Sequence, residues 1–395
     1  MHTHRTQVAI IGAGPAGLLL GQLLHQQGID SVILENRTRE YVIERVRAGV
    51  LEQATVDLMS DLGVGDRLRR EGLHHDGIYV AFGGARHRID MAALTGGRAI
   101  TVYGQNEVVK DLIDARRATT RPLTFEASNV SVHGIETEQP TVRYEHEGAA
   151  HEVRCEFIAG CDGFHGICRP AMPASVLRVY ERVYPYGWLG ILAEAAPSCP
   201  ELVYSLHDHG FALFSMRSPA ITRLYLQCAP DEDLSQWSDD RIWTELGIRL
   251  RTADGWEPNV GPILQKGVTP MRSFVADPMQ FGRLFLAGDA AHIVPPTGAK
   301  GLNLAASDVW LLSSAFGRFY ASGSDEQLRT YTADALRRVW WAQRFSWWMT
   351  STLHKSDSPN PFDHRRQFAE LDYLVGSRAA MTSLAENYVG RPFER

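Results

Sequence analysis

Two glycine-rich turns with nearby carboxylates have the residue types and spacing that best define a chemical role in this sequence. The first, Gly12-Ala13-Gly14-Pro15-Ala16-Gly17, follows an apolar run and precedes a leucine-rich segment. In a strand-turn-helix unit, Gly12 allows the tight turn, Gly14 lets the backbone approach a pyrophosphate, and Gly17 lets helix and strand pack closely. Glu35 ends the next apolar run, where a carboxylate can bind a ribose hydroxyl. A glycine motif alone is weak evidence, but this combination predicts a dinucleotide site.

The second turn is Gly288-Asp289-Ala290-Ala291-His292, which follows the apolar residues 284–287. Asp289 is suited to a ribitol or ribose hydroxyl, and a helix is expected from about Leu302. The N-terminus of that helix favours negative charge, as a second contact with the cofactor would require. Asp289 alone fits an ordinary strand-turn-helix unit equally well. The two turns together indicate a bound flavin.

A third motif, Cys161-Asp162-Gly163, lies between these turns and also follows an apolar run. In this order and at these distances, the three motifs resemble the single-component flavoprotein aromatic hydroxylases, and the likeness extends essentially from end to end. The resemblance implies an enzyme with FAD as cofactor, NADH or NADPH as hydride donor, and O2 as co-substrate. It also implies a flavin C4a-hydroperoxide that converts 4-hydroxybenzoate into 3,4-dihydroxybenzoate.

Two pairs of residues in a strand-rich block are candidates for binding the aromatic acid. Ser215 and Arg217 share one face of a predicted strand, where the guanidinium and the hydroxyl can hold a carboxylate. Arg223 and Tyr225 also share a face. Spacing alone favours a solvated strand-edge cation for each arginine. The resemblance instead implies that Ser215, Arg217 and Tyr225 bind the carboxylate, and that Arg223 supports the reduced flavin and its movement.

Hydroxylation also requires a group that removes the phenol proton, because a free phenol has a pKa of about 10. The resemblance implies that Tyr204 accepts a hydrogen bond from the substrate and that Tyr388 passes the proton towards His75 at the surface. Histidine is suited to exchanging that proton near neutral pH. His74 is adjacent and remains an alternative to His75. The Pro296 carbonyl is expected near the substrate hydroxyl.

The resemblance assigns further flavin contacts to side chains spread along the chain. With Gly12, Gly14, Ala16 and Gly17, the expected contacts are Glu35, Arg45, Arg47, Gln105, Asp162, Asp289, Leu302 and Asn303. Lys300 is expected to contribute positive charge near the site, although a solvated loop lysine is an equal alternative.

The expected contacts with the nicotinamide donor are Arg37, Tyr41, Arg47, His165 and Arg272. NADPH-using relatives commonly carry arginine at the position of Asn36, and Glu40 and Glu44 add negative charge nearby. A 2′-phosphate requires cations, so this segment favours NADH, or the use of both donors. Neighbouring arginines partly compensate.

The expected fold class is α/β, with a Rossmann-like FAD-binding domain interleaved with an α+β substrate domain. Apolar and polar residues alternate around Gly83-Gly84 as in a hairpin, further strands are expected between residues 202 and 227, and the chain becomes mainly helical after residue 305. The predicted FAD-binding domain comprises residues 1–74, 100–179 and 269–350. Residues 75–99 and 180–268 form the substrate-binding domain, and residues 351–395 form a C-terminal helical segment.

Composition excludes several other classes of protein. The 395 residues exceed the usual size of one core, and a net charge of −6 without long charge runs disfavours nucleic-acid or anionic-membrane partners. Five cysteines without a CxxC motif indicate reduced thiols and a cytoplasmic location. No signal peptide, membrane span or metal site is predicted. The tryptophan-rich residues 339–349 favour core or subunit packing, and the resemblance implies a homodimer.

Three alternatives share the nucleotide motifs. Another phenolic acid hydroxylase would differ only in its substrate, whereas a flavin-dependent halogenase would need a WxWxIP signature that this sequence lacks. A non-enzymatic escort protein would use the same fold without redox chemistry, and it would not be yellow when purified.

Overall fold

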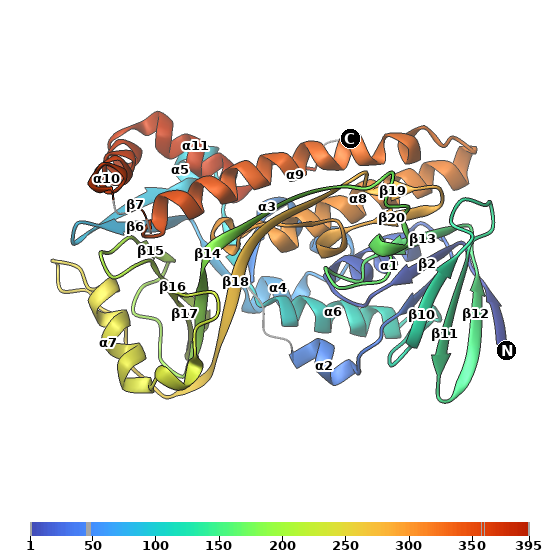
Figure 1. Cartoon of the computed structure of the whole chain (residues 1–395), viewed down its shortest axis with the longest axis horizontal. Helices are drawn as coiled ribbons and strands as arrows, with labels where there is room; N and C mark the ends of the chain where they lie inside the picture. The colour runs from blue at the N-terminus through green and yellow to red at the C-terminus, as the bar shows by residue number, and fades with distance from the viewer. Residues whose placement is uncertain (1, 45–48, 357, 359, 394–395) are drawn as a thin grey trace.

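The computed structural model describes residues 2–44, 49–356, 358 and 360–393. A smaller, mainly parallel sheet and a larger mixed sheet lie at opposite ends of an elongated molecule, and a long helix runs along both (Figure 1). Arg45 and Arg47 lie outside the described residues, so the flavin and nicotinamide contacts expected of them stay predictions.

The six-stranded sheet forms the nucleotide-binding half and confirms the Rossmann-like expectation. Its strands are, in order, β19 (Gln280–Phe281), β20 (Leu284–Leu286), β13 (Phe157–Gly160), β2 (Val8–Ile11), β3 (Ser31–Leu34) and β9 (Leu123–Thr124). The four central strands are fully buried and pair in parallel. Continuous apolar runs are typical of such strands, because helices cover both faces of the sheet.

Three helices pack around this sheet. They are α1 (Pro15–Gln26), α6 (Gln105–Arg117) and α8 (Gly301–Ser322). Pro15 occupies the first turn of α1, where its missing N–H costs no hydrogen bond, and nine consecutive residues from Ala16 to Leu24 are buried. The helix therefore begins directly after the glycine turn and is fixed between the sheet, α6 and α8.

The eight-stranded sheet forms the other half. Its order is β21 (His292–Ile293), β18 (Ile263–Asp277), β14 (Arg178–Ala193), β17 (Ile221–Cys228), β16 (Ala212–Ser218), β15 (Val203–Ser205), β6 (Gly77–Phe82) and β7 (Ala85–Asp90). The hairpin around Gly83-Gly84 and the strands between residues 202 and 227 are confirmed. The long antiparallel strands β14 and β18 run from this sheet towards the nucleotide-binding half (Figure 1).

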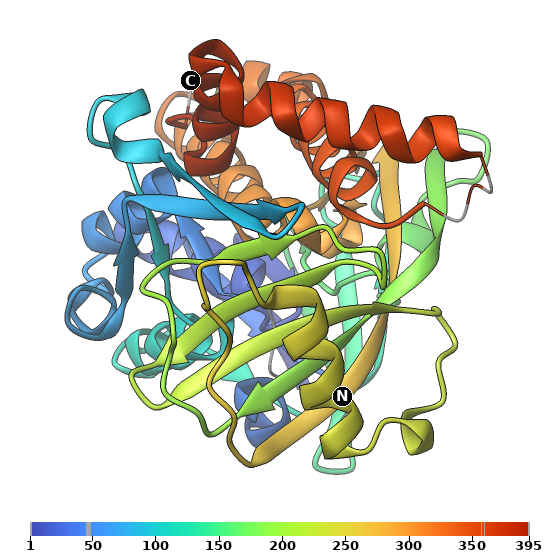
Figure 2. The same ribbon diagram turned by 90° about the vertical axis from the view of Figure 1, so that its left-hand side faces the viewer.

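The helical C-terminal part lies over the larger sheet (Figure 2). Its helices are α9 (Glu326–Leu353), α10 (Pro361–Gly376) and α11 (Arg378–Val389). Buried side chains of all three join the hydrophobic core of the eight-stranded sheet. On α9, Trp340 and Trp347 are exposed whereas Phe345 and Met349 are buried, so one face of the helix packs on the core. None of the described helices is long and apolar enough to cross a membrane.

Smaller elements complete the chain. A four-stranded sheet contains β1 (His2–Arg5), β12 (Ala149–Arg154), β11 (Thr141–His146) and β10 (Ser128–His133), and a three-stranded sheet contains β4 (Val50–Glu52), β8 (Ile100–Val102) and β5 (Leu73–His75). The remaining α-helices are α2 (Arg39–Glu44), α3 (Gln53–Asp61), α4 (Asp66–Glu71), α5 (Met91–Thr95) and α7 (Asp239–Leu250).

Candidate active site

The first glycine turn has the geometry that a pyrophosphate requires. Gly12 has φ +104°, and a Cβ there would lie 2.4 Å from the carbonyl oxygen of Cys161. A Cβ on Gly17 would lie 2.0 Å from the carbonyl oxygen of Gly12, so only glycine permits this helix–turn contact. A Cβ on Gly14, in contrast, would meet nothing within 4 Å. The backbone at the N-terminus of α1 is therefore open to an anionic group.

Glu35 lies beside this turn. One carboxylate oxygen accepts the Ala13 N–H at 2.8 Å and the other accepts the Arg37 N–H at 2.9 Å. These bonds hold a half-buried carboxylate at the end of β3, adjacent to the glycine turn. A ribose hydroxyl is a suitable further partner for a carboxylate held this way, so the first motif fits the nucleotide part of FAD.

The second turn is supported by a buried pair that the sequence did not single out. Asp308 of α8 accepts the Gly288 N–H at 2.9 Å and lies 2.6 Å from His292 Nε2. Burial lowers the pKa of His292, but the Asp308 carboxylate outweighs burial and raises it. Asp289 lies between these residues in a 3-10 turn and is exposed. The carboxylate expected to bind FAD is thus presented outwards on a fixed turn.

Asn303 uses its amide to connect α8 with the segment around β4. Its Oδ1 accepts the Glu52 N–H at 2.9 Å and the Thr55 hydroxyl at 2.8 Å, and its Nδ2 donates to the Val50 carbonyl at 3.0 Å. Leu302 occupies the same first turn of α8. The structure brings these two predicted flavin contacts together at a helix N-terminus, whereas Gln105 begins a different helix, α6.

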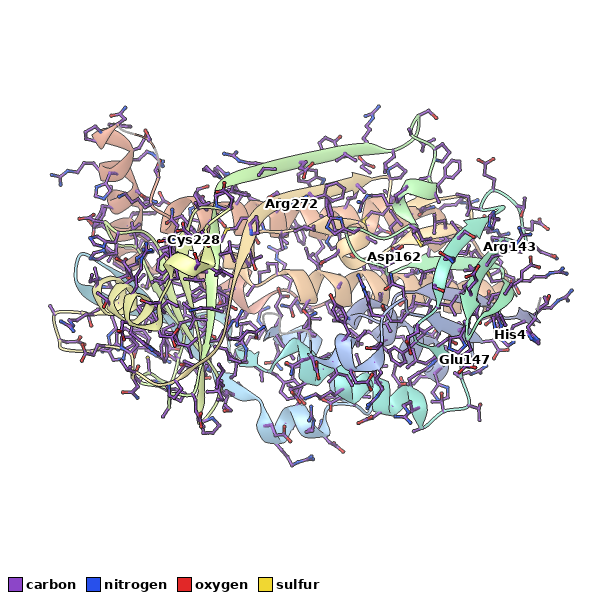
Figure 3. The ribbon with its side chains drawn as sticks, turned by 60° about the horizontal axis from the view of Figure 1, so that its bottom comes forward. His4, Arg143, Glu147, Asp162, Cys228 and Arg272 are labelled. Carbon is purple, nitrogen blue, oxygen red and sulfur yellow. The ribbon has the colours of Figure 1, made fainter. Side chains whose placement is uncertain are left out.

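Asp162 holds its own loop. Its carboxylate accepts the Cys168 N–H at 2.9 Å, and a Cβ on Gly166 would lie 2.1 Å from the Asp162 carboxyl carbon. Burial raises the pKa of Asp162. Figure 3 labels Asp162 on the loop after β13 and Arg272 on β18. The role of Asp162 in this structure is to shape the turn after β13, and a direct contact with FAD stays a prediction.

One face of the eight-stranded sheet carries the residues expected to bind substrate. Tyr204 of β15 is in register with Leu213 of β16, Leu213 with Tyr225 of β17, and Tyr225 with Gly190 of β14. Residues in register point to the same face of a sheet. Tyr204 and Tyr225 therefore lie on one surface although 20 residues separate them in the sequence.

The next positions along this face carry the arginines. Ser215 is in register with Arg223, and Arg217 Nη1 lies 3.3 Å from the Ser215 hydroxyl. Arg217 Nε and Arg223 Nε and Nη1 are buried without a hydrogen-bond partner among the described residues. Gly190 makes room for Arg223, because a Cβ there would lie 2.7 Å from Arg223 Nη2. Buried guanidinium donors without a protein partner are suited to an acceptor from outside the chain, such as a ligand carboxylate.

The arginines also change the acidity of the neighbouring tyrosine. Burial raises the pKa of Tyr225, but Arg223 and Arg217 together outweigh burial and lower it. The Arg223 guanidinium lies 5.1 Å from the Tyr225 ring centre. The pKa of Arg217 is lowered by burial. This end of the sheet face is therefore strongly electropositive and suits a carboxylate.

The two tyrosines expected to form a proton relay meet at another part of this face. The hydroxyl oxygens of Tyr204 and Tyr388 are 2.5 Å apart, and both side chains are buried. Burial is the main cause that raises the pKa of each tyrosine above its ordinary value. Both hydroxyls stay neutral near pH 7, so they can pass a proton only by accepting one and donating another.

The prediction that His75 lies at the surface was wrong. Its side chain is 1% exposed, and neither ring nitrogen bonds to a described protein group. Burial lowers the pKa of His75 to about 4 and outweighs the Glu201 carboxylate. Side chains alternate along β5, so His74 points outwards and lies 3.1 Å from Asp76. Only His74 of this pair is in direct contact with solvent.

Lys300 is buried and ion-paired, so the alternative of a solvated loop lysine was wrong. Its ammonium lies 2.6 Å from Glu52 Oε1 and donates to the Tyr388 carbonyl at 3.0 Å. Glu52 also pairs with Arg338 at 3.1 Å. Burial lowers the pKa of Lys300 more than the Glu52 carboxylate raises it. A half-open cavity of about 280 Å³ lies beside this group, with Trp341 among its lining residues.

The loop that begins at Pro296 forms a short 3-10 turn next to α9. The Pro296 carbonyl accepts the Ala299 N–H at 2.9 Å and retains a second lone pair for another donor. Thr297 accepts a hydrogen bond from the Thr350 hydroxyl at 2.9 Å. The loop is thereby anchored on the inner face of α9.

The expected nicotinamide contacts form two groups. The Arg37 guanidinium lies 5.2 Å from the ring centre of Tyr41, and both residues are exposed. His165 and Arg272 both lie against Phe164, at 5.0 Å between ring centres and 4.6 Å from guanidinium to ring. The described residues contain no cluster of three or more His, Cys, Asp or Glu that could hold a metal ion.

The chain combines a dinucleotide-binding turn with a sheet face that carries arginines and tyrosines. This combination is typical of FAD-dependent aromatic hydroxylases. The family described as "FAD binding domain" matches residues 5–382. The chain belongs to this family, and FAD is its cofactor.

Individual relatives agree with this class. The chain is 50% identical over 394 residues to the p-hydroxybenzoate hydroxylase of Acinetobacter baylyi, covering 100% of this chain and 97% of the relative. It is 26% identical over 350 residues to a probable NADH-specific resorcinol 4-hydroxylase of Rhodococcus jostii, covering 83% and 62%. The crystal structure of the p-nitrophenol 4-monooxygenase of Pseudomonas putida has the same fold, with a TM-score of 0.83, 19% identity, and coverage of 99% and 100%.

Proposed function

We propose that this enzyme hydroxylates 4-hydroxybenzoate beside its hydroxyl group and releases 3,4-dihydroxybenzoate, with O2 and NAD(P)H as co-substrates. The single observation that carries this proposal is the sheet face with arginines at one part and the Tyr204–Tyr388 hydroxyl pair at another. A benzoate with its hydroxyl opposite the carboxylate presents complementary groups to both. The p-hydroxybenzoate hydroxylase of A. baylyi, 50% identical along the whole chain, supports the same substrate.

The substrate carboxylate binds at the electropositive part of the face. Arg217 donates to it from its unpartnered Nε and from its terminal nitrogens, and the Ser215 hydroxyl is a further donor. Tyr225 completes the site with a phenol whose pKa the arginines lower. Arg223 lies on the same face and supplies charge towards the flavin. Charge-assisted bonds of this kind orient a flat ring as well as bind it.

At the other end, Tyr204 accepts the hydrogen bond of the substrate phenol and donates its own hydrogen to Tyr388. The proton then moves on towards His75, and His74 remains the alternative for exchange with solvent because it is exposed. Lys300, which pairs with Glu52 and donates to the Tyr388 carbonyl at 3.0 Å, contributes positive charge near this end of the site. The Pro296 carbonyl has a free lone pair to orient the substrate hydroxyl.

FAD, when bound, accepts hydride from the nicotinamide and, with O2, supplies the oxygen atom that is transferred. Glu35, Gln105, Asp162, Asp289, Leu302, Asn303 and the first glycine turn are the described candidates for holding it. Buried side chains of α9 and α11 pack into the core of the substrate-binding sheet, and this packing is proposed to exclude water from the substrate face.

NADH, or both donors, are proposed as reductants. Asn36, Glu40 and Glu44 are all exposed on the segment that also presents Arg37 and Tyr41, so a 2′-phosphate would meet two carboxylates there. His165 and Arg272 around Phe164 are the second set of donor contacts.

Three organisational expectations also stay proposals. They are the discontinuous division of the chain into FAD-binding, substrate-binding and C-terminal parts, a cytoplasmic location, and a homodimer. The five cysteines are free and buried, as reduced thiols would be. Exposed Trp340 and Trp347 on α9 offer an apolar surface for a second copy.

The test is a comparison of NADH and NADPH oxidation by the purified yellow protein with and without 4-hydroxybenzoate, while 3,4-dihydroxybenzoate is quantified. The proposal expects strong stimulation and one product molecule per nicotinamide oxidised. Stimulation without product would make 4-hydroxybenzoate an effector. Absence of stimulation would redirect the search to other phenolic acids.

A further inference from the structure

A buried histidine and a buried tryptophan form a second polar contact on the same side of the sheet as the substrate face. Trp188 of β14 and His354, the residue directly after α9, are 3% and 1% exposed. The indole N–H of Trp188 donates to His354 Nε2 at 2.6 Å. The two residues are 166 positions apart, so this bond fixes the end of α9 to the substrate-binding sheet.

The two hydrogen bonds of the His354 ring define its protonation state. An indole nitrogen can only donate, so His354 Nε2 is unprotonated and accepts. His354 Nδ1 lies 2.9 Å from the Thr350 carbonyl, which can only accept, so Nδ1 carries the proton. The imidazole is therefore neutral and uses both nitrogens. Burial also lowers the pKa of His354 to about 3.

Aromatic stacking fixes the ring plane. His354 stacks on Tyr186 at 4.7 Å with an interplanar angle of 7°, and on Phe211 at 4.4 Å with an angle of 22°. Gln367 of α10 donates to the His354 backbone carbonyl at 2.6 Å. The imidazole is held by two rings and two hydrogen bonds, and the Gln367 bond holds its backbone, so the ring and the Trp188 indole bonded to it are fixed in one orientation.

Trp188 transmits this orientation to the substrate face. It lies on the same face of β14 as Gly190, which is in register with Tyr225. Its indole packs against the Tyr225 ring at 4.7 Å and against Phe211 at 5.2 Å. Phe211 in turn lies 6.2 Å from the ring of Tyr204. Both tyrosines that the proposed function places against the substrate therefore pack on an aromatic layer that the Trp188–His354 hydrogen bond holds to the end of α9.

The C-terminal end of α9 also holds the loop that begins at Pro296. Thr350, whose carbonyl accepts the His354 N–H, donates its hydroxyl hydrogen to Thr297 in the loop that begins at Pro296. One turn of helix thus holds both the loop that begins at Pro296 and the indole that packs against Tyr225.

We propose that His354 is a positioning residue for substrate binding, which acts through its hydrogen bond to Trp188 and fixes Tyr225 and Tyr204 in binding geometry. This inference rests on the proposed function for its consequence, though not for the contact itself. Removing the acceptor would leave a buried indole N–H without a partner, which favours a rotated indole. Tyr225 and Tyr204 would then pack against side chains that no longer have one fixed orientation.

The test combines four variants with two measurements. His354→Leu removes the acceptor, His354→Gln restores an acceptor oxygen, Trp188→Phe removes the donor, and Leu and Phe are also combined. Trp243→Phe is the matched control, because its indole donates to the Gly261 carbonyl at 3.1 Å away from this layer. The dissociation constant for 4-hydroxybenzoate is measured calorimetrically on the holoenzyme, and the near-ultraviolet circular dichroism reports the fixed indole.

His354→Leu is expected to weaken 4-hydroxybenzoate binding about 10-fold, as the loss of one buried hydrogen bond implies, and to remove the dichroism band that Trp188→Phe also removes. His354→Gln should recover most of both signals. In the double variant the two losses should not add, because each breaks the same contact. Trp243→Phe should bind like the natural enzyme.

Additive losses, or a Leu variant with unchanged affinity and dichroism, would overturn the proposal. If His354→Leu does not fold, Trp188→Phe carries the test, and unchanged substrate affinity in that variant overturns it equally. A natural enzyme that binds no 4-hydroxybenzoate would instead contradict the proposed function. The dichroism band would still decide whether His354 fixes Trp188.

Discussion

The hydroxyl oxygens of Tyr204 and Tyr388 lie 2.5 Å apart although the two residues are separated by 184 positions. One is on a strand of the substrate-binding sheet and the other on the last described helix. Their contact therefore forms only when α11 closes over the sheet. The proposed relay therefore depends on the packing of the C-terminal helices as well as on the tyrosines themselves.

Replacing Tyr204 with Phe should separate flavin reduction from hydroxylation. The variant keeps the ring and loses the hydroxyl that accepts the substrate proton, so product formation should fall about 100-fold, as for loss of a proton-transfer group. NAD(P)H oxidation should continue. The measurement is the ratio of 3,4-dihydroxybenzoate formed to nicotinamide oxidised. Tyr331→Phe removes another buried hydroxyl, bonded to the Leu286 carbonyl, and should leave that ratio unchanged. An unchanged ratio in Tyr204→Phe would rule out the relay.

Arg217→Met should weaken binding of 4-hydroxybenzoate at least about 30-fold, because truncating one partner of a buried charged pair costs about 2 kcal/mol or more. Arg217→Lys should recover only part of this loss, since an ammonium cannot make two parallel N–H bonds. The control is the ligand itself: 4-hydroxybenzamide has no charge and should lose much less affinity. Equal losses for acid and amide would contradict a carboxylate site at Arg217.

Gly14→Val should weaken FAD binding about 10-fold or more while the apoprotein keeps its melting temperature, since the new side chain enters space that is open in the protein but needed by the pyrophosphate. Gly17→Ala should behave differently, because its Cβ would lie 2.0 Å from the Gly12 carbonyl oxygen and must disturb the fold. Fluorescence titration of the apoproteins with FAD and thermal melting distinguish the two. A lowered melting temperature in Gly14→Val together with an unchanged one in Gly17→Ala would contradict the roles given to these two glycines.

Asn36→Arg should shift donor preference towards NADPH by about 10-fold, because a guanidinium beside a 2′-phosphate forms a charge-assisted pair. The measurement is the ratio of kcat/KM for NADPH to that for NADH. Asn36→Gln is the control for side-chain length and should leave the ratio close to that of the natural enzyme. If both variants change it alike, charge at this position does not select the donor.

The nucleotide-binding half could be predicted from sequence because its signals are local. Gly12, Gly14 and Glu35 each have a role fixed by neighbouring backbone, and buried parallel strands appear as continuous apolar runs. The substrate face was harder. Alternation placed Ser215 with Arg217 and Arg223 with Tyr225, but only strand register shows that both pairs lie on one face.

Residues whose partners are distant in sequence were missed or misplaced. Glu52, Asp308 and His354 are ordinary polar residues in sequence, and each becomes recognisable only when folding buries it beside Lys300, His292 or Trp188. The resemblance placed His75 at the surface, where a histidine is suited to exchange a proton. Strand alternation decides otherwise: of two adjacent histidines, one must face the interior.

The burial of His75 makes stability dependent on pH in a defined direction. Its pKa is about 4 in the folded protein, against 6.5 when it is not buried, so the unfolded chain binds more protons between these values. The contribution of His75 to stability is therefore fully present above about pH 6.5 and decreases as the pH falls towards 4, by about 1.4 kcal/mol per pH unit.

His75→Gln cannot take up the proton. Its free energy of unfolding should thus fall about 2 kcal/mol less between pH 7 and pH 5 than that of the natural enzyme, as measured by urea unfolding at both values. His74→Gln, at an exposed position, should follow the natural enzyme. If the His75 and His74 variants lose equal stability on acidification, His75 is accessible to protons in the folded state and its assignment as a buried relay group is wrong.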